Sequence, residues 1–166
     1  CGTNPATPSS FLSLSTTSCV DSSVPNGTYT YTVTSVLNTW KATSEPSSSL
    51  VVTGDTHAPS QVVSMTSSNA LKTGNTIYFR AAAAGSLTLS AAVTDGISGP
   101  ASATFPAIST TGWTHASETV TTGSGTNPKT FTSSAFTWNA DAATPSTYGV
   151  LGKDVVGNQT TTDLTF

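Results

Sequence analysis

Three aspartates in short, loop-like stretches have the clearest capacity for chemistry in this sequence. Asp95 opens the run DGISG, Asp141 lies in WNADAA and Asp154 opens DVVGN. Extracellular proteins often bind Ca²⁺ through carboxylates in loops, but the commonest use of a loop aspartate is to accept hydrogen bonds from the amides of its own turn. No EF-hand spacing is present. Calcium binding and turn formation therefore both stay open for these side chains.

Acid–base and nucleophilic chemistry has few candidates. A serine or threonine nucleophile needs a base within hydrogen-bond reach, and only His57 and His115 could serve. Because 60 of the 166 residues are Ser or Thr, a histidine beside a hydroxyl is expected by chance. Glu45 and Glu118 fall in different predicted modules, and no cysteine–histidine cluster suggests zinc. We therefore expect no catalytic residues and no bound cofactor.

Hydroxyl side chains take the place of charged ones in this composition. Charged residues make up only 8% of the chain, and the net charge is -3. Threonine combines a hydroxyl with a β-branched carbon that suits a strand, so the composition favours an all-β exported protein. Four lysines and one arginine provide no basic stripe for nucleic acid, and no apolar run approaches the roughly 20 residues of a membrane span. We expect an extracellular location.

The two cysteines, Cys1 and Cys19, predict a disulfide. Such a bond would restrain the unfolded chain by roughly 3 kcal/mol in the loop-entropy model. Two alternatives are an acylated Cys1, since CGTNPATPSS resembles the polar tether of a bacterial lipoprotein, and two free thiols. We interpret the start at Cys1, without a Met or an apolar signal core, as that of a processed or excised chain.

The elements that carry these residues are expected to be strands. Tyr29, Tyr31 and Val33 alternate with threonines and predict a half-buried strand, and residues 50–52 predict another. We expect a loop at residues 38–49, which makes Trp40 the best candidate for an exposed, ligand-facing aromatic side chain. Turn formers and a proline at residues 53–59 predict a domain boundary, giving modules at 1–54 and 55–166.

Alternation of apolar and polar residues continues through the second module. Leu87, Leu89, Ala91 and Val93 give the clearest case. Strands are expected at residues 61–66, 76–80, 86–94, 101–105, 118–122, 130–138, 147–153 and 160–166. This number of short strands in about 110 residues is typical of an immunoglobulin-like antiparallel β-sandwich.

Two segments resemble known modules. DSSVPNGTYTYTVTSV followed by TSEPSSSLVV is similar to the second half of a fibronectin type III domain. The resemblance implies that Tyr29 is a corner tyrosine, with its hydroxyl bonded to an upstream backbone group. DTHAPS, VTDGISGPASATFPA and YGVLGKDVVGNQTTTDLTF resemble bacterial immunoglobulin-like repeats, which are common in cell-surface and pilus-associated proteins.

These features favour a noncatalytic stalk, spacer or fibre subunit of a larger bacterial surface protein or filament. The alternative is an adhesive module that binds carbohydrate or a host surface protein through its loops. A fibronectin type III domain has about three more strands before residue 10 than this chain supplies. We expect them from the rest of a longer chain or, alternatively, from a neighbouring copy that donates a strand.

Overall fold

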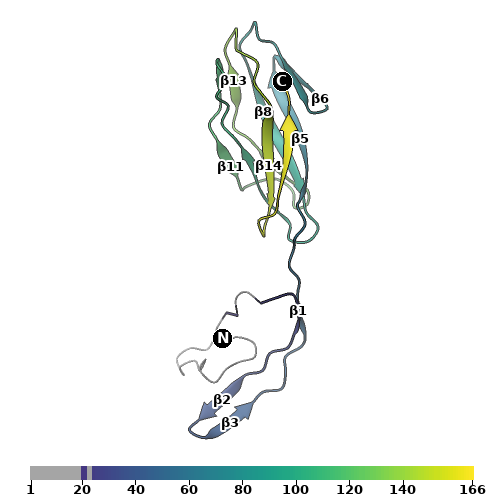
Figure 1. Ribbon diagram of the computed structural model, residues 1–166, viewed down its shortest axis with the longest axis vertical. Coiled ribbons are helices and arrows are strands. Elements are labelled where there is room, and N and C mark those ends of the chain that lie inside the picture. The colour runs from purple at the N-terminus through teal and green to yellow at the C-terminus, as the bar shows by residue number, and fades with distance from the viewer. Residues whose placement is uncertain (1–19, 22–23) are drawn as a thin grey trace. The chain divides into compact units, whose positions relative to one another are not determined.

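The computed structural model describes residues 20–21 and 24–166, and it divides the chain into two compact units, Cys1–Gly54 and Asp55–Phe166 (Figure 1). The described residues form an all-β structure of several antiparallel sheets without a helix. No helix able to cross a membrane therefore occurs among them. Cys1 and Cys19, and with them the predicted disulfide, lie outside the described residues.

The first unit contains two pairs of antiparallel strands. β1 (Gly27–Tyr29) pairs with β4 (Leu50–Val52), and β2 (Thr34–Leu37) pairs with β3 (Trp40–Thr43). Backbone bonds between Ser44 and Val33 and between Ser47 and Tyr31 connect the two pairs. The Tyr29 hydroxyl donates to the carbonyl of Pro25 at 3.0 Å, which is the upstream bond that the resemblance implies.

Two expectations for this unit were wrong. Residues 38–49 are not all loop, because Asn38 adopts a positive φ of 53° and turns the chain directly into β3. The expected strand over residues 28–34 is interrupted between β1 and β2. Its apolar face is also more open than alternation suggested, since Tyr31 is 40% and Val33 73% exposed.

The larger sheet of the second unit is built around β8 (Gly85–Thr94). On one side, β5 (Ser60–Ser68) pairs with β8 over nine residues. On the other side, β8 pairs with β12 (Lys129–Thr132) and then β13 (Phe136–Trp138). β10 (Trp113–Thr114) extends the sheet beyond β13. All these pairings are antiparallel.

A second sheet has the order β11–β9–β14–β15. Its strands are β11 (Glu118–Val120), β9 (Pro100–Phe105), β14 (Tyr148–Asp154) and β15 (Gln159–Leu164). A hairpin of β6 (Ala70–Thr73) and β7 (Thr76–Phe79) meets the end of the chain through a parallel bridge between Thr76 and Thr165.

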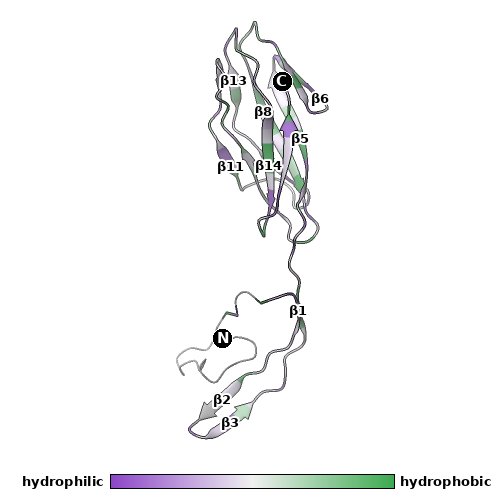
Figure 2. Cartoon of the chain, in the orientation of Figure 1, coloured by the Kyte–Doolittle hydropathy of each residue, from purple (hydrophilic) through white to green (hydrophobic). Residues whose placement is uncertain are grey.

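The core of the second unit is formed by the hydrophobic side chains on the inward faces of both sheets. Hydrophobic and hydrophilic residues both occur along the strands (Figure 2), as two-residue alternation requires. Phe105, Phe131 and Val150 are fully buried, and Leu87 is 2% exposed. An aromatic group of Phe79, Trp113, Trp138 and Phe166 closes one end of this core.

The strand over residues 130–138 is also corrected by the structure, which divides it into β12 and β13. Ser133 separates the two strands while staying bonded to β8. Its amide donates to the Leu89 carbonyl at 2.9 Å, and its hydroxyl accepts from the Leu89 amide at 3.0 Å. The short strands β6 and β10 were not anticipated, and β10 has only two residues, too few for a periodic pattern.

Candidate functional site

Three aspartates of the second unit converge at one end of its sheets. Asp55 precedes β5, Asp95 directly follows β8 and Asp154 ends β14. One carboxylate oxygen from each lies within 4.8 Å of the others. The side chain of Asp55 is 2% exposed, and the residues Asp95 and Asp154 are 6% and 1% exposed. We call these three residues the carboxylate cluster.

Asp95 organises the loop that follows β8. Its Oδ1 accepts hydrogen bonds from the amides of Ile97 (3.0 Å), Ser98 (2.8 Å) and Gly99 (2.8 Å). These donors, the Gly99 amide first among them, favour the ionised form and lower the pKa of Asp95, although burial opposes the shift. The backbone of Asp95 is held by the Asn127 side chain, which accepts from its amide at 3.1 Å and donates to its carbonyl at 2.6 Å.

Asp154 plays the same part in the turn between β14 and β15. Its Oδ1 accepts from the amides of Gly157 (2.6 Å) and Asn158 (2.8 Å), and its Oδ2 accepts from the Asn158 side-chain amide at 2.8 Å. Gly157 has a φ of 106°, a conformation that other residues rarely adopt. The carboxylate therefore stabilises a turn whose backbone depends on glycine.

Asp55 connects the start of the second unit to both of these loops. Its Oδ1 accepts from the His57 amide at 2.9 Å, and its Oδ2 accepts from the Ser98 amide at 3.2 Å. Its backbone carbonyl accepts from the Asn158 side chain at 3.2 Å. His57 is exposed, and its Nδ1 lies 3.8 Å from the Asp55 carboxylate. Two distant loops thus hold the first residue of the unit in place.

The carboxylate cluster matches the donor chemistry of a hard divalent cation such as Ca²⁺, which takes six to eight oxygen ligands. Three carboxylates supply part of such a set, and each already accepts amide hydrogen bonds. Of the three aspartates that the sequence suggested as calcium ligands, Asp95 and Asp154 lie close together in the structure. Asp141 is exposed in a separate turn with a φ of 63°. Asp55 was missed, although it opens the boundary turn DTHAP.

A second cluster of polar side chains, His115, Glu118 and Ser134, links the edges of the two sheets. The Ser134 hydroxyl donates to Glu118 Oε1 at 2.9 Å, while His115 Nδ1 lies 3.5 Å from the same hydroxyl. His115 is buried and stacked on Phe136, with 3.5 Å between ring centroids, and its Nε2 lies 3.8 Å from Glu118 Oε1. Tyr148 also packs against Phe136, and its pKa is raised mainly by burial and to a smaller extent by the negative charge of Glu118. Because the serine is directed to Glu118, the group ties β11 to the segment before β13.

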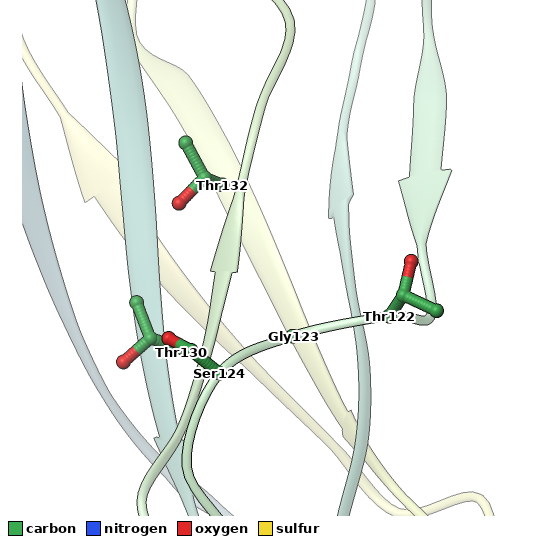
Figure 3. Close-up of a pocket in the computed structure, with 5 residues that line it drawn as sticks. All are labelled: Thr122, Gly123, Ser124, Thr130 and Thr132. Carbon is green, nitrogen blue, oxygen red and sulfur yellow. The ribbon is translucent and has the colours of Figure 1, made fainter.

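Two further surface features, an exposed tryptophan and a shallow hollow, are uncharged. Trp40 lies on β3, where it is 80% exposed, so its predicted exposure is confirmed although its loop is not. A surface hollow beside β12 is lined by Thr122, Gly123, Ser124, Thr130 and Thr132 (Figure 3). The Ser124 and Thr130 amides and carbonyls bond to each other at 3.0 and 2.8 Å. The lining therefore offers hydroxyl and backbone groups without a titratable side chain.

The chain was compared with protein families, curated proteins and solved structures. No family model, curated protein or solved structure matches it.

Proposed function

We propose that the chain is a noncatalytic structural segment, acting as a stalk, spacer or fibre subunit of a larger extracellular bacterial protein. In this proposal the second unit is an immunoglobulin-like sandwich and the first is part of a fibronectin type III-like module. The antiparallel pairing of β8 with β5, β12 and β13 supports the first assignment. The bond from Tyr29 to Pro25 supports the second.

The placement of the two ends of the second unit gives this proposal its strongest support. The chain enters at Asp55, which bonds to the loop after Thr94, the last residue of β8. At the other end, Phe166 packs on Trp113 beside Trp138, and Trp138 pairs with Gly85, the first residue of β8. Asp55 and Phe166 therefore lie toward opposite ends of the strands (Figure 1).

The distance between these ends follows from β15. Asn158 donates to the Asp55 carbonyl, and the chain then runs through β15 (Gln159–Leu164) to Phe166. Eight residues of extended chain at about 3.3 Å each give a separation of roughly 25 Å. A unit with this geometry keeps whatever is attached on either side apart by a fixed length.

The same placement determines how the unit would bear a load. Tension between Asp55 and Phe166 acts along the strands, so it shears β5 against the nine paired residues of β8. It also shears β15 against the six paired residues of β14. In shear, all the hydrogen bonds of a ladder share the load before any of them breaks.

Single-molecule pulling of the full chain tests this proposal. One set of handles is placed at positions 55 and 166, and a second at positions 55 and 96, where Ser60 and Thr94 are paired and the load opens the β5–β8 ladder one pair at a time. We expect a higher unfolding force from the first set, in one step of about 350 Å for about 110 residues. Equal forces in the two directions, or gradual lengthening, would contradict a load-bearing spacer.

A second candidate function rests on Trp40. An 80% exposed tryptophan is unusual on a soluble surface, and its flat ring suits the apolar face of a sugar or a partner protein. A glycan array probed with the full chain, with Trp40→Ala as control, tests this adhesive function. Binding that Trp40→Ala abolishes would support adhesion through Trp40. Binding that survives this substitution, or no binding to any glycan, would contradict it.

A further inference from the structure

The outward face of the five-stranded sheet contains almost only hydroxyl side chains. The strand registers and alternate burial place fourteen residues on this face. None is charged, and all except Val62 and Ala92 carry a hydroxyl. We call the set the hydroxyl face: Ser60, Val62, Ser64, Thr66, Ser68, Ser86, Thr88, Ser90, Ala92, Thr94, Thr114, Thr130, Thr132 and Thr137.

The other sheet of the same unit has a different outward face. Lys153 and Gln159 are paired there, as are Leu151 and Thr161, and Asp163 lies farther along the strand. That face therefore mixes both signs of charge with apolar and polar groups, as an ordinary solvated surface does. With 8% charged residues and 60 hydroxyl residues among 166, any fourteen residues of this chain contain on average about one charged and about five hydroxyl side chains. The hydroxyl face is therefore distinguished by its twelve hydroxyls more than by its lack of charge.

The hydroxyls of this face form rows across the strands. Ser64, Ser90 and Thr132 are in register, with Ser90 Oγ and Thr132 Oγ1 2.9 Å apart and the Ser64 hydroxyl donating to the Ser90 carbonyl at 3.4 Å. In another row, the Ser68 and Ser86 hydroxyls lie 3.3 Å apart. Successive rows recur about every 6.7 Å along a strand, and strands are spaced about 4.8 Å apart.

The hydroxyl face continues into the hollow beside β12. Thr130 and Thr132 belong to both, and Thr122, Gly123 and Ser124 form the remaining lining (Figure 3). The hydroxyl face thus ends in a concave, hydroxyl-lined edge. A sheet face with such an edge can hold an extended ligand along its rows and bind one unit of that ligand in the hollow.

We propose that the hydroxyl face and the adjoining hollow bind an uncharged polysaccharide. Each serine or threonine hydroxyl donates one hydrogen bond and accepts others, which matches the hydroxyls of a sugar. A charged ligand would find no opposite charge on this face, whereas a neutral one leaves no charge to be desolvated. Val62 and Ala92 lie side by side in one row and offer an apolar strip to the C–H face of a sugar ring.

Depletion assays with insoluble polysaccharides test the proposal on the full chain. The probes are microcrystalline cellulose, chitin and an insoluble β-1,3-glucan, and the measured quantity is the protein left in the supernatant. We expect at least one probe to deplete the protein, with equal affinity in low salt and in about 1 M NaCl because no charge is involved. Retention in the supernatant with all three probes would overturn the proposal, as would binding that disappears at high salt.

Matched lysine substitutions locate the site. Thr66→Lys places a charge on the hydroxyl face, and Thr161→Lys places one on the outward face of the other sheet. Both threonines are exposed residues within a strand. Affinity should fall about tenfold or more with Thr66→Lys and less than about twofold with Thr161→Lys. Equal losses in the two variants would overturn the assignment to this face.

A second pair controls for lost hydrogen bonds. Thr132→Lys removes a 2.9 Å hydroxyl contact with Ser90, and Thr119→Lys removes a 2.8 Å contact with Thr104 on the other sheet. Only Thr132→Lys should weaken binding, with both variants folded by circular dichroism.

Two further results would overturn the proposal. One is loss of binding in Trp40→Ala, because Trp40 lies in the other unit. The second is the discovery, by mass spectrometry of protein from its natural source, of sugars covalently attached to these hydroxyls. The face would then be an acceptor of glycans and not a site that binds them.

Discussion

Replacing Gly85 with alanine tests the packing at the end of the core. Gly85 begins β8 and pairs with Trp138. A Cβ at position 85 would lie 2.2 Å from Trp138 Cζ2 and 2.7 Å from two further ring atoms, far inside van der Waals contact. The indole cannot easily move, because its Nε1 donates to the carbonyls of Ala83 (2.9 Å) and Arg80 (3.3 Å).

The magnitude follows from two opposing effects. Overpacking a filled core costs about 1–3 kcal/mol. Replacing glycine restricts the unfolded chain, which offsets about 0.4–1 kcal/mol of that cost. We therefore expect Gly85→Ala to lower the free energy of unfolding by about 1–2 kcal/mol, which corresponds to a drop in Tm of about 5–10 °C for a unit of this size.

Urea denaturation of the full chain, followed by tryptophan fluorescence, measures the effect. Trp113 and Trp138 are buried in the second unit, so their signal reports its unfolding. Gly96→Ala is the matched control, since a Cβ at position 96 meets no atom within 4 Å. It should be neutral or slightly stabilising, by up to about 1 kcal/mol.

Equal stabilities of Gly85→Ala and Gly96→Ala would contradict this prediction, because they would mean that the Trp138 ring shifts freely. Coupling gives a second check. Exchanging Trp138 for phenylalanine removes the Cζ2 atom that the new Cβ meets, so Gly85→Ala should cost less in a Trp138→Phe background than alone. An identical cost in both backgrounds would place the strain elsewhere.

Three further predictions concern buried polar groups. Ser133→Ala deprives the Leu89 amide of its 3.0 Å acceptor, so urea denaturation should show a loss of about 1–3 kcal/mol; an unchanged midpoint would contradict this. The lowered pKa of Asp95 means that its contribution to stability is present above its ordinary value of 3.8 and is lost as pH falls through the folded pKa. In Asp95→Asn, the free energy of unfolding should therefore fall less steeply with decreasing pH than in the wild type. The same pH dependence in both proteins would contradict this prediction. Because the pKa of Tyr148 is raised in the folded protein, the free energy of unfolding should fall as pH rises above about 10. Thermal melts at alkaline pH should show less of this fall in Tyr148→Phe. An unchanged fall would mean that another group causes it.

Strand positions in the second unit were largely predictable from periodicity. Leu87, Leu89, Ala91 and Val93 alternate along β8, and all four are buried as expected. The pairing partners of β8 were not predictable, because alternation specifies which face a residue occupies and not which strand lies beside it. The break at Ser133 also escaped prediction, since a serine can bond to a neighbouring strand in place of the regular ladder.

The candidate site shows a similar division. DGISG and DVVGN correctly identified Asp95 and Asp154 as aspartates of tight turns, because such turns need a nearby acceptor for their amides. Their closeness to Asp55 depends on the starts and ends of three strands meeting at one end of the unit, which local patterns do not encode. The sequence likewise showed a high content of serine and threonine, but it could not show that twelve of them share one face. That arrangement depends on the registers of the five strands.

If the second unit is a spacer, its two ends stay apart at a fixed distance. The most direct measurement is the distance distribution between site-specific labels at positions 56 and 165 of the full chain, obtained by pulsed electron spin resonance. We expect one narrow population near the roughly 25 Å that the extended segment after Asn158 spans. A broad distribution, or labels much closer together than this, would contradict it.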